Sequence, residues 1–96
     1  MASIKALTSE ASALLARALG RPAEALGQLH LARQLWTSID SRLNAARLRL
    51  DVAELQTELG DEGGASEEIR AALATAEALG SVRLVRRCKT MLRGEV

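Results

Sequence analysis

Apolar residues recur along this chain at alternating spacings of three and four, which is the pattern of one face of an α-helix. Near the N-terminus the pattern predicts a helix over about 3–19. Its apolar stripe consists of Ile4, Leu7, Ala11, Leu14 and Ala18. Gly20 follows and suits a left-handed helix cap, and Pro22 is tolerated in the first turn of the next helix.

The same spacing predicts four more helices, over about 22–39, 42–59, 64–79 and 81–93. The second and third helices carry apolar residues on more than one side, so we expect neighbours to cover them on more than one side. Trp36 lies on the apolar stripe of the second helix, which favours a place in the core over a role as a binding anchor.

The composition favours an all-α protein. The 96 residues correspond to one domain or a piece of one, and 48% of them are apolar, which is enough for a core. Phe and Tyr are absent and Trp36 is the one aromatic residue. A core of Leu, Ala, Ile and Val suits close helix packing better than a sheet.

The sequence also repeats itself. When it is shifted by 40 residues the two halves align without a gap, and Gly20 falls on Gly60. The alanines that coincide are Ala13 with Ala53, Ala25 with Ala65 and Ala32 with Ala72. A helix-turn-helix period of about 20 to 50 residues is typical of an α-solenoid. We therefore expect a single domain over 1–96 made of two antiparallel hairpins, about 3–39 and 42–79, and a closing helix over about 81–93.

These small and apolar residues resemble the tetratricopeptide repeat (TPR). The positions that match its spacing are Ala13, Gly20, Ala25, Leu29 and Ala32, and again Ala53, Gly60, Ala65, Ile69 and Ala72. The period of 40 differs from the roughly 34 residues of that family. Ala16 and Gln56 stand where an aromatic residue is usual, and the terminal proline is missing. The resemblance implies a fragment of a TPR-like α-solenoid.

Residues 20–93 also resemble the C-terminal helical-repeat arrays of large bacterial signalling proteins, through segments such as AALATAEALGS at 71–81. These include TPR-containing adenylate/guanylate cyclases and transcriptional regulators of the LuxR and MalT kind. The resemblance implies a non-enzymatic module for protein-protein interaction, or a scaffold, in signal transduction.

In such repeats the first helix of each hairpin lines a concave face, which binds a peptide or helix of another protein. The partner-binding residues that the resemblance implies are Leu7, Glu10, Leu14, Arg17, Arg47, Leu50, Glu54, Glu58, Arg87 and Thr90. Chaperone-binding members use Asn in a carboxylate clamp, but Leu14 and Glu54 occupy that position here. We therefore do not expect this chain to bind a chaperone tail.

No group of residues points to catalysis, a metal or a cofactor. His30 stands alone and Cys88 is the one cysteine, whereas a zinc site needs three or four ligands. Cys88 falls on an apolar stripe with Val85 and Leu92, which favours a buried thiol over a reactive one. The pairs Glu54-Glu58 and Glu67-Glu68 lie on polar helix faces and are interpreted as solvated surface. We expect a protein that is not an enzyme.

The net charge of +1 hides an uneven distribution. Residues 61–80 hold five acidic residues and one basic, whereas residues 81–96 hold five basic and one acidic. The simplest interpretation is that the last helix packs on the one before it and the charges offset. A basic patch for nucleic acid or anionic lipid is the alternative, and it lacks stacking aromatic residues.

Two further expectations concern the location of the protein and its self-association. No apolar run approaches the roughly 18 residues that cross a bilayer, and no apolar signal core is present, so we expect a cytoplasmic, soluble protein. Repeats usually need about three units for stability. An alternative function is therefore self-association, in which the exposed side of the first or last helix pairs with another copy as a homodimer.

Overall fold

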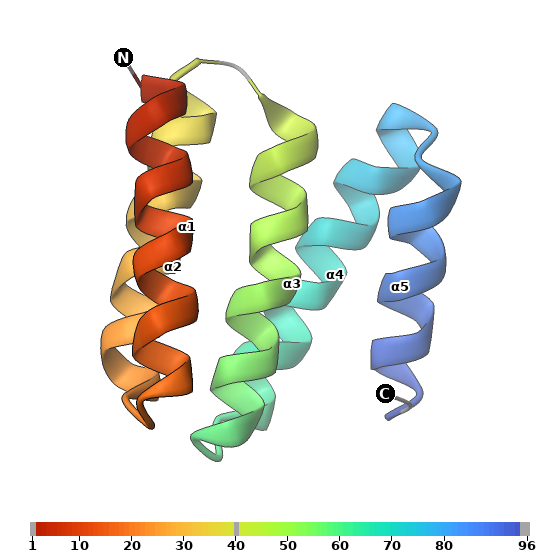
Figure 1. The fold of residues 1–96 in the computed structure, drawn as a ribbon. Coiled ribbons are helices and arrows are strands. Elements are labelled where there is room, and N and C mark those ends of the chain that lie inside the picture. Colours follow the sequence, from red (N-terminus) through yellow and green to blue (C-terminus); the bar gives the residue numbers. More distant parts are fainter. Residues whose placement is uncertain (1, 40, 95–96) are drawn as a thin grey trace.

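The computed structural model describes residues 2–39 and 41–94, and these residues form five α-helices and no strand (Figure 1). The helices are α1 (Ala2–Ala18), α2 (Pro22–Ser38), α3 (Arg42–Glu58), α4 (Glu62–Leu79) and α5 (Val82–Leu92). Each expected helix is present, and its ends lie within two residues of the expected ones. The prediction of an all-α protein is confirmed.

The helices pack in chain order. Contacts join α1 to α2, α2 to α3, α3 to α4 and α4 to α5. Short turns reverse the chain at each step, so α1, α3 and α5 run in the same direction and lie from left to right across one side of the molecule (Figure 1). Side chains from these three helices can therefore share one face.

Glycine and aspartate set the turn between α3 and α4. Gly60 has a φ of 86°, in the left-handed region that glycine adopts without a steric penalty. The Asp61 side chain then accepts a hydrogen bond of 2.9 Å from the Gly64 backbone N–H. A Cβ atom at position 64 would collide with the Asp61 carboxylate. This cap explains why α4 begins at Glu62, two residues before the expected start.

The core of the described residues consists of two clusters that meet at α3. One cluster joins α1, α2 and α3 and includes Leu48, Val52 and Trp36. The other joins α3, α4 and α5 and includes Leu50 and Cys88. The central position expected for the third helix is therefore confirmed, as are the buried positions of Trp36 and Cys88.

Small residues line the contacts between paired helices. Ala53 of α3 and Ala65 and Ala72 of α4 are all buried in the same cluster. Helix axes can approach to the short end of the usual range of about 8–10 Å only where contact side chains are small. The alanines that recur in the sequence therefore lie where close helix packing needs them.

The apolar stripe of α1 faces away from the core. The buried residues of this helix are Ala6, Ser9, Ala13 and Ala16. Ile4, Leu7 and Leu14 are instead 60%, 56% and 71% exposed. The small side chains allow α1 to lie close against α2, and helical geometry then places the larger residues on the opposite side.

Candidate functional site

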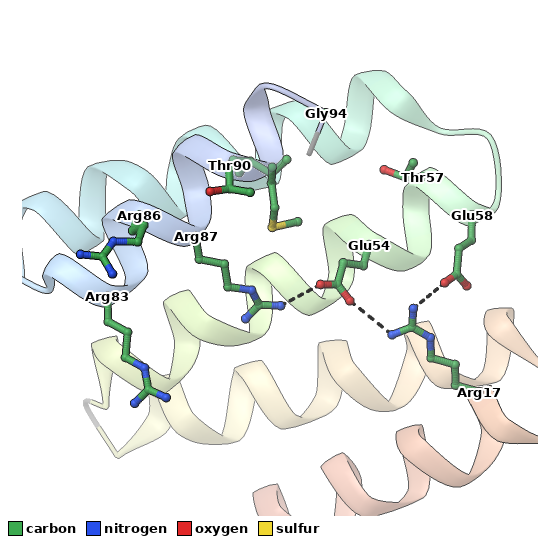
Figure 2. Close-up of a pocket in the computed structure, with 11 residues that line it drawn as sticks. Arg17, Glu54, Thr57, Glu58, Arg83, Arg86, Arg87, Thr90 and Gly94 are labelled. Carbon is green, nitrogen blue, oxygen red and sulfur yellow. Dashed lines mark hydrogen bonds and ion pairs between the residues drawn. The ribbon is translucent and has the colours of Figure 1, made fainter. Parts of the chain in front are cut away.

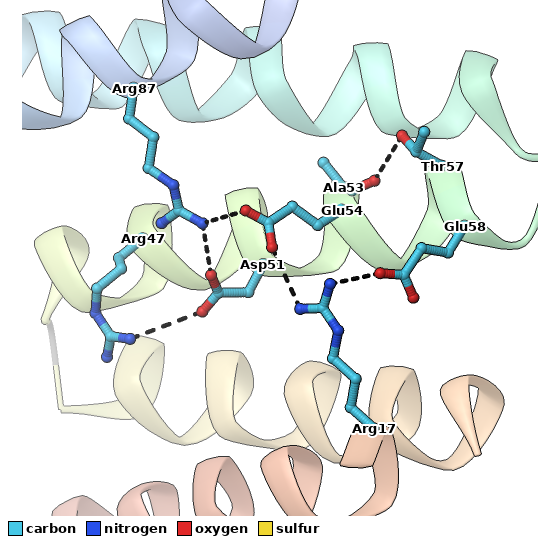
Figure 3. A network of polar contacts seen from close by, with 8 residues as sticks. All are labelled: Arg17, Arg47, Asp51, Ala53, Glu54, Thr57, Glu58 and Arg87. Carbon is cyan, nitrogen blue, oxygen red and sulfur yellow. Dashed lines mark hydrogen bonds and ion pairs between the residues drawn. The ribbon is translucent and has the colours of Figure 1, made fainter. Parts of the chain in front are cut away.

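Charged side chains of α1, α3 and α5 meet on one face of the molecule (Figure 3). At its centre, Arg87 of α5 reaches across to α3. Its Nη2 atom lies 2.7 Å from Asp51 Oδ1 and 3.0 Å from Glu54 Oε1. The guanidinium of Arg87 therefore joins two carboxylates that lie one turn apart on the neighbouring helix.

Glu54 is also the link to α1. Its second carboxylate oxygen, Oε2, accepts a hydrogen bond of 3.3 Å from Arg17 Nη1. Arg17 Nη2 donates to Glu58 Oε1 in addition. A continuous line of alternating charges therefore runs from α5 through Glu54 to the C-terminal end of α1 (Figure 3).

The line of charges continues toward the other end of α3 through Arg47. Arg47 Nη2 lies 3.0 Å from Glu10 Oε1, and Arg47 Nη1 lies 3.8 Å from Asp51 Oδ2. The other oxygen of Glu10 accepts a hydrogen bond of 2.7 Å from Trp36 Nε1. Glu10 therefore satisfies the polar atom of a buried indole and pairs with a surface arginine at the same time.

We call these residues the polar network: Glu10, Arg17, Trp36, Arg47, Asp51, Glu54, Glu58 and Arg87. Hydrogen bonding to Glu58 and Glu54 raises the pKa of Arg17 despite some burial. Burial lowers the pKa of Arg87, but its bonds to Asp51 and Glu54 outweigh that effect and raise it overall. Because most of these side chains are between a quarter and a half exposed, each pair adds little stability. Their main effect is to fix where the charges lie.

A groove of about 590 Å³ opens between α3 and α5, beside the polar network (Figure 2). Its apolar part comes from Ile69 and Met91, which belong to or pack against the core cluster of α3, α4 and α5. Arg83, Arg86 and Thr90 of α5 also line it. So do four residues of the polar network: Arg17, Glu54, Glu58 and Arg87. This size lies within the range of about 300–1,000 Å³ that is typical of ligand pockets.

Arg83 and Arg86 differ from Arg87 in having no ion-pair partner among residues 2–39 and 41–94. Both are exposed, and Figure 2 shows them extending from α5 without a contact to the other residues drawn. The groove therefore presents two uncompensated positive charges next to an apolar wall.

A smaller hollow of about 190 Å³ lies between α1 and α3. Leu14 and Leu29 supply apolar atoms, and Glu10, Arg17 and Arg47 border it with charges that are already paired. Arg17 lines both hollows. On the α5 side of the face, the positive charges of Arg83 and Arg86 therefore have no acidic partner among the described residues. On the α1 side, most of the charges are paired.

Nine of the ten residues expected in a partner-binding strip are at least partly accessible. Those in the polar network are Glu10, Arg17, Arg47, Glu54, Glu58 and Arg87, while Thr90 lines the groove and Leu7 and Leu14 are exposed on α1. Leu50 is the exception, because it is fully buried in the cluster of α3, α4 and α5. A partner cannot reach it in this conformation.

The sequence reasoning missed Arg83 and Arg86 as residues of the groove. The signal was the run of basic residues over 81–96, which we interpreted as charge offset against the preceding helix. Arg87 instead pairs across to Asp51 and Glu54 of α3. The order of the helices along the chain did not reveal that side chains of α5 contact α3.

Among the residues considered for other chemistry, the thiol is buried and three of the carboxylates are held in ion pairs. Cys88 is fully buried, and burial raises the pKa of its thiol, which keeps the sulfur neutral and unreactive. Glu54 and Glu58 lie at the surface as expected but are held in ion pairs, and Glu68 lies 3.0 Å from Arg49. Within the described part of the chain, no three His, Cys, Asp or Glu side chains gather closely enough to hold a metal ion.

Comparison with known families, with curated proteins and with solved structures finds no match for this chain. Among residues 2–39 and 41–94, no helix combines the length and the hydropathy that crossing a membrane requires.

Proposed function

We propose that this protein is a non-enzymatic interaction module of the TPR-like type, which binds an acidic peptide or helix of another protein in the groove between α3 and α5. The chain-order packing of five helices, the 40-residue repetition and the buried alanines at the helix contacts support the TPR-like part of the proposal. The resemblance to bacterial repeat arrays favours a role in a cytoplasmic signalling or regulatory protein.

One observation carries the proposed partner chemistry: Arg83 and Arg86 line the groove without an ion-pair partner among the described residues. Arginine binds carboxylates with two parallel N–H···O bonds, and such charge-assisted bonds are stronger than neutral ones. Ile69 and Met91 offer an apolar surface in the same groove. A segment that places acidic side chains next to a Leu or Ile therefore complements both parts of the groove.

A protein partner fits this groove better than a nucleic acid. Single-stranded nucleic acids bind to protein grooves through stacking of bases on aromatic side chains as well as through charge. The one aromatic residue of this chain, Trp36, is buried, and its N–H is bonded to Glu10.

The proposal can be tested with a fluorescein-labelled helical peptide that carries Glu at positions i and i+4 beside Leu. A second peptide with Gln in place of each Glu is the matched probe. Fluorescence anisotropy should show salt-sensitive binding of the Glu peptide and binding at least about tenfold weaker for the Gln peptide. Equal affinity for the two peptides, or no binding of either, contradicts the proposed partner chemistry.

Charge reversal locates the site. The double variant Arg83→Glu with Arg86→Glu should weaken binding of the Glu peptide by about tenfold or more, because it replaces two attractions by repulsions. Arg70→Glu is the control, since Arg70 is exposed on α4 and lies outside the groove. If both variants bind alike, the groove is not the site. Duplex DNA that binds more tightly than the peptide would favour a nucleic-acid function instead.

A further inference from the structure

The exposed apolar stripe of α1 is a surface that the proposed function does not use. We call it the α1 seam: Ile4, Leu7, Ala11, Leu14 and Ala18, which are all exposed. Their spacing of three, four, three and four is the a/d pattern with which two helices pack along a seam. Leu15 and Leu19, also exposed, lie beside it. An apolar surface of this extent on one helix marks an interaction site.

The fold itself does not require these residues to be apolar. A shift of 40 residues relates α1 to α3, and the residues of α3 that correspond to the last four positions of the seam are Arg47, Asp51, Glu54 and Glu58. All four are charged and belong to the polar network. The same helical face can therefore be fully charged in this fold, so the apolar content of the α1 seam calls for a different explanation.

We infer that the α1 seam binds the α1 seam of a second copy of this chain, in an antiparallel homodimer. A two-fold symmetric contact needs a surface that is complementary to itself. In the antiparallel register that centres on residues 12 and 13, Leu7 of one protomer faces Ala18 of the other, and Leu14 faces Ala11. Each of these leucines then meets an alanine, and the helices can approach closely over residues 7–18.

The charges beside the seam select the antiparallel direction. Glu10 and Arg17 lie on the same flank, where the seam borders α3. In the antiparallel register Glu10 of each protomer lies near Arg17 of the other, whereas in a parallel pair Glu10 would lie beside Leu15 of the second copy and meet no opposite charge. The contacts of Glu10 with Arg47 and of Arg17 with Glu54 do not change the signs of these charges.

Two helices bury less than the roughly 800 Å² per partner of a standard interface, so the dimer should dissociate in the micromolar range. Sedimentation equilibrium should therefore show a mass that rises with concentration from 10.2 kDa toward twice that value. Leu14→Glu should abolish the rise by placing two carboxylates in the seam. Leu31→Glu, on α2, replaces a leucine that is 45% exposed outside the seam and should leave the rise unchanged.

The register can be tested separately with cysteine pairs in a Cys88→Ala background. An equimolar mixture of Leu7→Cys and Ala18→Cys chains should form disulfide-linked heterodimers, because these positions face each other across the antiparallel seam. Predominant homodimers of each variant would indicate parallel pairing and overturn the inference. A constant mass of one chain up to about 200 µM, well above a micromolar dissociation constant, would also overturn it. So would a dimer that survives Leu14→Glu.

Discussion

Helices α1 and α3 have the same length of 17 residues and align with one another under the 40-residue shift. They differ in the size of the side chains that they bury. In α3 the large residues Leu48, Leu50, Val52 and Leu55 are all buried. In α1 the buried residues are three alanines and one serine, and the leucines face solvent. Identical periodicity therefore does not imply an identical orientation toward the core.

The difference follows from the number of neighbours. Helix α3 packs against both α2 and α4, so it needs apolar residues on two sides. Helix α1 packs mainly against α2. The positions of α1 that correspond to Leu48 and Val52 are Thr8 and Ser12, which are exposed. A polar flank suits a helix that, among the described residues, packs mainly against one neighbour.

The largest expected effect tests this contrast directly. Leu48→Ala should destabilise the protein by about 2–5 kcal/mol, because Leu48 is fully buried between α3 and the first hairpin and its removal leaves a cavity. Leu14→Ala, in the matching helix, should cost less than about 0.5 kcal/mol because Leu14 is already exposed. Urea unfolding followed by circular dichroism at low protein concentration gives both free energies. Similar costs for the two variants would mean that α1 buries its leucines in solution.

The sequence predicted the helices well because their signals are local. Apolar spacing gave five helices, and glycines after Leu19, Leu59 and Leu79 marked their ends. It did not predict which face of α1 is buried, because a stripe of alanines and a stripe of leucines both have helical spacing. The choice depends on how closely α2 approaches, and this distance is a property of the packed hairpin rather than of either helix alone.

The next effect concerns Glu10, which together with Arg17 connects α1 to the charged residues of α3. Glu10→Ala should cost about 1–3 kcal/mol, because the Trp36 N–H loses its acceptor in a part-buried position. Glu10→Gln keeps a carbonyl oxygen for the indole and should cost clearly less. Unfolding can be followed by the fluorescence of Trp36, which is the one tryptophan of the chain. Equal costs for the two variants would show that the charge of Glu10, and not its bond to Trp36, is what matters.

The candidate site was predictable only in part. The strip predicted along the first, third and fifth helices included Arg17, Glu54 and Arg87, which the structure brings together. Leu50 was misplaced because the helical spacing puts it near the edge between the exposed and the buried face of α3, and α4 and α5 cover that edge. The groove residues Arg83 and Arg86 depend on the distance between α5 and α3, which the sequence does not encode locally.

The smallest expected effect concerns Arg17, which joins α1 to Glu54 and Glu58 of α3. Arg17→Ala should cost less than about 1 kcal/mol, since the side chain of Arg17 is 42% exposed and surface ion pairs are weak. Because bonding to Glu58 and Glu54 raises the pKa of Arg17, its contribution is present at neutral pH and is lost as the pH rises into the strongly alkaline range. The cost should shrink further in high salt, which screens exposed charges.

The control for this variant is Arg42→Ala, because Arg42 is exposed at the start of α3 and has no ion-pair partner among the described residues. It should not destabilise the protein at any salt concentration, because a positive charge in the first turn of a helix is slightly unfavourable. A cost for Arg17→Ala well above about 1 kcal/mol that salt does not reduce would mean that solvent is excluded from the network. In that case ion pairs would hold α1 and α3 together as strongly as their apolar contacts do. The two helices would then differ only in whether their leucines are buried.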